Sequence, residues 1–88
     1  MIEARKLRLV KAIDDHGSLV RAARVLGIAQ PALTRALARL EARLRGRLFE
    51  RSRRGVIATD LGRAIIAEGG AILERLDRHL AEARHPDP

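Results

Sequence analysis

The chain has 88 residues, no cysteine, a single aromatic residue and a net charge of +7, which suits one small domain with an aliphatic core, of mostly α-helical structure. Without cysteine there is no disulfide framework, thiolate metal site or cysteine nucleophile. The sequence has no apolar run long enough to cross a bilayer, and its N-terminus is too charged for a signal-peptide core, so we expect a cytoplasmic protein with no membrane partner.

The positive charge is concentrated in the middle of the chain. Net charges are +1 over residues 1–17, +8 over residues 18–58 and −2 over residues 59–88. The middle segment contains ten arginines and only two acids, Glu41 and Glu50. This distribution predicts a surface that faces a polyanion.

Three helices are expected in the first half of the chain. Apolar residues at helical spacing predict a helix up to about Ile13. Ser18 is a suitable N-cap for a second helix over about 19–26, which Gly27 ends in the left-handed conformation. Pro31, which cannot lie inside a helix, fits the first turn of a third helix over about 30–44. The apolar positions of the first and third helices are Leu7, Val10, Ile13, Leu33, Leu37, Leu40 and Leu44.

The second and third helices are expected to form a tight helix-turn-helix. Ala22 and Ala23 are small enough to let them approach closely. The polar side of the third helix then carries Gln30, Thr34, Arg35, Ala38 and Arg39.

The sequence between residues 48 and 59 predicts a short β-hairpin with a basic tip, SRRG, anchored to the core by Phe49. Thr59 is expected to cap a last helix from Asp60 to about Arg84. The residues that follow, HPDP, are expected to be a frayed tail.

The last helix carries a heptad stripe of apolar or small residues. Because no other face of so small a domain is left to cover it, we expect it to pair with a second copy of the chain. The adjacent Gly69 and Gly70 indicate either a close helix crossing or a bend. The expected dimerisation residues are Ile66, Gly69, Leu73, Leu76 and Leu80.

These elements describe a mostly α fold, a winged helix-turn-helix of three helices and a β-hairpin wing over residues 1–58, followed by a long dimerising linker helix over 59–85 and a tail over 86–88. The run Gly17–Gly62 closely resembles the DNA-binding domain of LysR-type bacterial transcriptional regulators. The matching pieces, at the family's spacing, are GS, AA, QPALTR, LE, LFER, the RG of the wing, and the T and G that open the linker helix.

The resemblance implies a homodimer that binds double-stranded DNA. Its recognition helix, about 30–44, would enter the major groove, its wing, 51–56, would reach the minor groove, and its linker helix would join two subunits. The family's larger ligand-sensing domain has no counterpart here, so we expect an excised DNA-binding domain without a small-molecule ligand, with a natural short protein as the alternative. Two departures stand out: Ala29 replaces a serine before Gln-Pro, removing a hydroxyl cap, and Arg45 replaces a glycine, so the helix end is expected to shift or to carry a further basic contact.

Individual roles follow from residue chemistry and the family match. Gln30, beside Pro31, is expected to contact a base or phosphate, and Arg35 either guanine or phosphate. Arg53 and Arg54 suit a narrow minor groove. The other expected DNA-binding residues are Ser18, Arg21, Thr34, Arg39 and Arg51, the last of which could instead form an ion pair.

No enzyme, metal site or cofactor is expected, because His16, His79 and His85 are scattered and Asp14 and Asp15 have no nucleophile beside them. The sequence therefore predicts sequence-specific DNA binding and transcriptional regulation. Two alternatives remain open: another winged-helix family, such as the molybdate-responsive regulators, and a basic helical module that binds a protein or a membrane surface.

Overall fold

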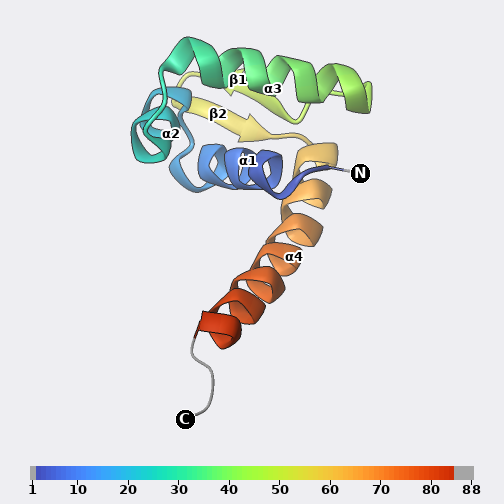
Figure 1. Cartoon of the computed structure of the whole chain (residues 1–88). Helices are drawn as coiled ribbons and strands as arrows, with labels where there is room; N and C mark the ends of the chain where they lie inside the picture. Colours follow the sequence, from blue (N-terminus) through green and yellow to red (C-terminus); the bar gives the residue numbers. More distant parts are fainter. Residues whose placement is uncertain (1, 85–88) are drawn as a thin grey trace.

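A computed structural model describes residues 2–84 and places four helices and one two-stranded antiparallel sheet within them (Figure 1). The elements in chain order are α1 (Ala4–His16), α2 (Leu19–Leu26), α3 (Gln30–Leu44), β1 (Phe49–Ser52), β2 (Gly55–Ala58) and α4 (Asp60–Arg84). The expected fold class, three helices followed by a hairpin and a long helix, is confirmed. The expected tail over 86–88 lies outside the described residues.

The core lies where α1, α2, α3 and the hairpin meet. Ala22 and Ala23 of α2 are almost fully buried, and their small size lets this helix pack closely on its neighbours, as expected. Phe49, the only aromatic residue, is buried at the start of β1 and anchors the hairpin. The buried core residues are Val10, Ile13, Ala22, Ala23, Leu33, Leu40, Leu48 and Phe49. Leu37 and Leu44, the other two leucines of the α3 stripe, are partly buried against this cluster.

Helix α4 starts beside the hairpin, crosses α1 and then extends away from the rest of the molecule (Figure 1). This projection makes the molecule 52 Å long but only 25 Å and 21 Å across. Thr59 caps the helix as expected, because its Oγ1 accepts a hydrogen bond from the Gly62 N–H at 3.0 Å.

The expectation that the heptad stripe of α4 has no partner within the chain is wrong for its first half. Leu73 is only 3% exposed. A Cβ atom at Gly69 would lie 2.7 Å from Leu7 Cδ2, so Gly69 is the point at which α1 and α4 cross closely. Ile66 is partly buried against the core. The stripe is therefore shared between α1 and solvent, and of the two glycines only Gly69 marks a close crossing, within one continuous helix.

The end of α3 is not shifted by the presence of Arg45 at the position where the resemblance leads one to expect glycine. The helix ends at Leu44, and Arg45 itself adopts the left-handed conformation with φ 55°, which costs free energy for a residue with a side chain. Its N–H donates to Ala42 O at 3.3 Å, and the Gly46 N–H donates to Glu41 O at 3.1 Å.

Candidate nucleic-acid interface

The break between α2 and α3 is built from backbone conformation. Gly27 has φ 70°, and the next residue, Ile28, donates its N–H to Ala23 O at 3.0 Å, closing the end of α2. Pro31 lies in the first turn of α3, where its missing N–H costs no hydrogen bond. Ala29 is the N-cap and makes no side-chain cap bond, as the sequence predicts.

The exposed side of α3 carries the expected polar residues. Its buried side holds Leu33 and Leu40 against the core, so residues on the opposite side project into solvent. The expected site residues of this helix, all exposed, are Gln30, Pro31, Thr34, Arg35 and Arg39.

The start of α2 lies beside the wing. Ser18 is the N-cap of α2, and its Oγ accepts a hydrogen bond from the Arg21 N–H at 3.2 Å. Gly17 O, one residue earlier, accepts the Val56 N–H of β2 at 3.0 Å. A Cβ atom at Gly55 would lie 2.0 Å from that same oxygen. The hairpin can approach the helix-turn-helix this closely only because residue 55 is glycine.

The wing has a short basic tip. Its strands pair in the register Arg51 with Val56 and Ser52 with Gly55. Ser52 Oγ accepts the Arg54 N–H at 3.2 Å and donates to Gly55 O at 3.4 Å, which fixes the turn. The expected wing residues Arg51, Arg53 and Arg54 are exposed.

The structure brings the wing and the recognition helix together at one surface. Thr34 of α3 and Arg51 of β1 line the same hollow of about 130 Å³ between the two elements. Gln30 and Arg35 lie on the same exposed helix, whereas Arg53 and Arg54 lie at the far end of the hairpin. The surface thus has a helical part and a separate basic tip.

Most of the arginines of this surface are not neutralised by acids. The ion pairs among residues 2–84 are Arg8–Asp77, Lys11–Asp15, Arg43–Glu3, Arg47–Glu41 and Arg63–Asp60. None of them involves Arg21, Arg35, Arg39, Arg51, Arg53 or Arg54. The alternative of an acidic partner for Arg51 therefore fails within the described part of the chain. Arg24 and Arg45, which the sequence interpretation did not include, are also exposed and without an ion pair there.

Two of the acids, Asp77 and Glu3, pair with other arginines, whereas Glu41 and Glu50 line the hollow beside Thr34 and Arg51. Arg8 donates a hydrogen bond to Asp77 Oδ1 at 2.7 Å, joining α1 to α4. This bond holds the pKa of Asp77 below its ordinary value of 3.8 and raises the pKa of Arg8. A hydrogen bond from its own backbone, followed by the one from Arg43, lowers the pKa of Glu3. Both carboxyl groups stay ionised at neutral pH, and neither of them pairs with Arg35 or Arg39 on the exposed side of α3.

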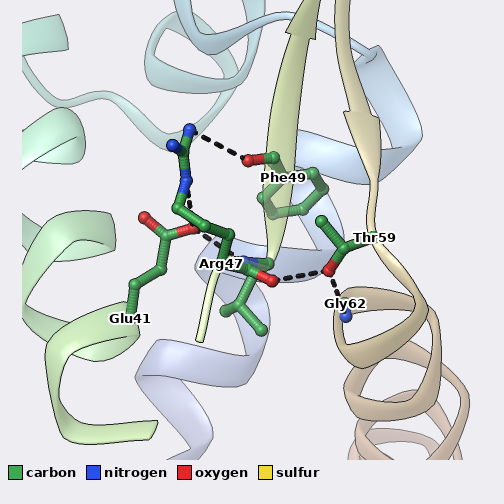
Figure 2. Close-up of polar contacts among 6 residues, drawn as sticks. Glu41, Arg47, Phe49, Thr59 and Gly62 are labelled. Carbon is green, nitrogen blue, oxygen red and sulfur yellow. Dashed lines mark hydrogen bonds and ion pairs between the residues drawn. The ribbon is translucent and has the colours of Figure 1, made fainter. Parts of the chain in front are cut away.

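A polar junction of Glu41, Arg47 and Thr59 lies behind this surface, and sequence reasoning missed it (Figure 2). Glu41 Oε2 accepts the Leu48 N–H at 2.7 Å, and Thr59 Oγ1 donates to Arg47 O at 2.5 Å. Arg47 also donates to Phe49 O at 3.3 Å. No helical or strand periodicity signals the two main contacts, because Glu41 and Leu48 are 7 positions apart in the chain and Arg47 and Thr59 are 12 apart.

Comparison with known proteins identifies this arrangement. The family model described as bacterial regulatory helix-turn-helix protein, lysR family, matches residues 4–63. The chain belongs to the LysR family of bacterial regulators. This assignment agrees with the resemblance of the run Gly17–Gly62, and it leaves the molybdate-responsive alternative without support.

Two regulators illustrate how far the similarity of this LysR-family chain extends. The small neutral protease regulatory protein of Streptomyces coelicolor is 46% identical over 83 residues, which are 94% of this chain and 25% of that protein. The nitrogen assimilation regulatory protein nac of Escherichia coli is 43% identical over 74 residues, which are 84% of this chain and 24% of that protein. The chain thus spans about a quarter of the length of these relatives.

Solved structures of the family share the fold of nearly the whole chain. A structure of the BenM DNA-binding domain with catB site 1 DNA matches with a TM-score of 0.88 and 32% identity, covering 96% of this chain and 94% of that one. A CbnR DNA-binding domain in complex with DNA matches with a TM-score of 0.83 and 36% identity, covering 94% and 95%. The winged helix-turn-helix with its long fourth helix is therefore a fold that this LysR-family chain shares with domains solved on DNA.

Two classes of site are not found among residues 2–84. None of the helices there combines the length and the apolar character needed to cross a membrane. The same residues include no group of three or more histidine or acidic side chains arranged to hold a metal ion.

Proposed function

We propose that this chain binds double-stranded DNA sequence-specifically, as the DNA-binding part of a LysR-type transcriptional regulator acting in the cytoplasm. The observation that carries the proposal is the set of exposed arginines on α2, α3 and the wing that have no ion pair among residues 2–84. Arginines in that state can contact phosphates without first breaking an internal pair. The regulators and DNA complexes to which the chain is similar support the same function.

In this proposal the exposed side of α3 enters the major groove. Gln30 and Arg35 contact base edges, while Thr34 and Arg39 contact the backbone beside them. Arg53 and Arg54 reach the neighbouring minor groove from the wing tip. Ser18 and Arg21 meet a phosphate at the N-terminus of α2, where free N–H groups favour an anion. The function is binding rather than catalysis and requires no cofactor.

Selection from random duplexes tests the proposal. The protein is mixed with a pool of random double-stranded DNA, and the bound molecules are recovered and sequenced over several rounds. A motif with two related half-sites, about 10 bp apart or a multiple of that spacing, is expected. Recovery of no sequence above its level in the input pool would refute sequence-specific binding.

Substitutions then assign the residues. Arg35→Ala or Gln30→Ala is expected to flatten the sequence preference, whereas Arg54→Ala should weaken binding to all sequences and reduce the salt dependence by roughly one unit of slope. Arg75→Ala on α4 is the matched control, because it removes the same charge from an exposed residue without an ion pair and away from this surface. If Gln30→Ala and Arg35→Ala both keep the motif and the affinity, the assignment is wrong.

We further propose that α4 pairs with the same helix of a second copy. The expected residues Leu76 and Leu80 are 37% and 43% exposed, and the structure adds Ile72 at 55%. Such exposed apolar residues on one side of a projecting helix suit a two-fold interface. Gly69 and Leu73 lie toward α1 and contribute to this interface only indirectly.

Two neighbouring substitutions test the dimer. Ile72→Glu introduces a charge on the proposed interface, and Ala71→Glu introduces the same charge at the preceding residue, which is exposed on another side of α4. Sedimentation equilibrium should show a weakened dimer for Ile72→Glu and an unchanged one for Ala71→Glu. Equal behaviour of the two variants would contradict pairing through this side of the helix.

A further inference from the structure

Two helices with different tasks are held by the same short piece of backbone. In the function proposed above, α3 reads DNA and α4 carries the partner subunit. Within the described residues, α4 packs mainly on α1, and its start reaches α3 through the segment Arg47–Phe49 (Figure 2). The contacts of this segment therefore help to set the direction of one helix relative to the other, together with the packing of both helices on α1.

The side of the segment toward α3 is held by one carboxylate. Glu41 Oε2 accepts the Leu48 N–H at 2.7 Å and lies 3.8 Å from the Arg47 Nε. The Glu41 side chain is only 17% exposed, in contrast to the 69% of Arg47. A carboxylate shielded from water in this way makes a stronger hydrogen bond to a backbone amide than an exposed one.

The side toward α4 is held by the hydroxyl group and the backbone amide of Thr59. Thr59 donates its Oγ1 hydrogen to Arg47 O at 2.5 Å and its N–H to Leu48 O at 2.9 Å. The same Oγ1 accepts the Gly62 N–H in the first turn of α4. Leu48, whose backbone is hydrogen-bonded to both Glu41 and Thr59, is fully buried and cannot shift without disturbing the core.

We propose that Glu41 is a positioning residue that fixes the angle between the recognition helix and the linker helix, and thereby the half-site spacing that the dimer accepts. It touches no DNA in this proposal. Its carboxylate accepts the N–H of Leu48, and the carbonyl oxygen of the same Leu48 accepts the N–H of Thr59, the N-cap residue of α4. When the carboxylate is lost, α3 still presents the same side chains, but the direction of the partner subunit relative to α3 becomes less defined.

This inference rests on the proposed dimer and predicts a result that local damage to α3 would not give. One duplex carries a single selected half-site, and a series of duplexes carries two half-sites whose separation changes by one base pair at a time. The wild-type protein should prefer one separation. Glu41→Ala should keep the affinity for the single half-site within about twofold and lower the preference for the best separation about tenfold, the size expected for one charge-assisted hydrogen bond.

Matched variants separate positioning from charge and from folding. Glu50→Ala removes the same charge from an exposed residue of β1 and should keep the spacing preference of the wild type. Thr59→Val, which keeps the side-chain shape but not the hydroxyl group, should also weaken the spacing preference. Thr59→Ser, which keeps the hydroxyl group, should retain the preference of the wild type. Glu41→Gln keeps an acceptor oxygen and the side-chain size. If Glu41→Ala is unfolded at the temperature of the binding assay, Glu41→Gln is the variant whose spacing preference is compared with that of the wild type.

The outcomes distinguish the two levels of the proposal. If the wild-type protein shows no preference for two half-sites over one, the proposed dimeric function fails and this inference fails with it. If the wild type shows a spacing preference and Glu41→Ala and Thr59→Val keep it, only the positioning role is overturned. It is also overturned if Glu41→Ala loses affinity for the single half-site to the same degree as for the pair.

Discussion

Replacing Gly62 by alanine tests how closely α4 is attached to the hairpin. The added Cβ atom would lie 2.1 Å from Leu48 O, which belongs to the backbone and cannot rotate away. The start of α4 must then move, which weakens the hydrogen bonds of Thr59 to Leu48 O and Arg47 O, at 2.9 Å and 2.5 Å. Each bond contributes about 1 kcal/mol, and overpacking adds roughly 1–3 kcal/mol.

A better helix propensity offsets only part of this loss, because alanine is about 1 kcal/mol more favourable than glycine inside a helix. We therefore expect Gly62→Ala to lower the free energy of unfolding by roughly 3 kcal/mol and the melting temperature by about 12–24 °C. The control is Gly70→Ala in the same helix, where a Cβ atom would meet nothing within 4 Å. That variant should gain about 1 kcal/mol and melt about 4–8 °C higher.

The assay is thermal and urea unfolding followed by circular dichroism at 222 nm. All three proteins are compared at one protein concentration, because the stability of a dimer depends on concentration. A Gly62→Ala variant as stable as Gly70→Ala would refute the close approach of α4 to Leu48, since both substitutions bring the same helix propensity.

Three further predictions concern single residues. Ala29→Ser should raise the free energy of unfolding in urea by about 1 kcal/mol, because the N-cap of α3 is extended and has no side-chain bond; a loss of stability would count against this cap geometry. Arg45→Gly should raise it by about 0.5–1 kcal/mol by relieving the positive φ, and an unchanged urea midpoint would show that no strain exists there. Because Arg8 lowers the pKa of Asp77 from 3.8, the pair stabilises the fold above that pH. The stability difference between wild type and Asp77→Asn should be present at pH 7 and disappear as the pH falls below 3.8; a difference that persists in acid would mean that the ion pair is not its cause.

The order of the elements and most of their boundaries could be predicted because local residues determine them, although the first helix continues to His16 rather than ending at about Ile13. Gly27 and Pro31 separate α2 from α3, since one favours the left-handed conformation and the other cannot continue a helix. Ser18 and Thr59 start helices by accepting backbone N–H groups only three residues away. All of these signals act over a few residues.

Contacts between distant segments were harder to predict. The sequence predicts that the apolar stripe of α4 is free for a second subunit, because nothing in it shows that Leu7 of α1 crosses this helix at Gly69. Glu41 was read only as part of a family motif, although its carboxylate holds the backbone at Leu48. The sequence predicts that Arg45 either shifts the end of α3 or adds a basic contact; the end does not shift, because Arg45 itself adopts the left-handed conformation.

The sequence by itself determined the fold class, the breaks between the helices and the concentration of arginine in residues 18–58, because propensity, capping and charge are local properties of the chain. The tertiary structure decided which apolar faces are already covered, which arginines lack an acidic partner among residues 2–84, and how the recognition helix is tied to the linker helix. These depend on which residues meet across the core, and a close contact such as that of Gly62 with Leu48 exists only once the elements have packed together.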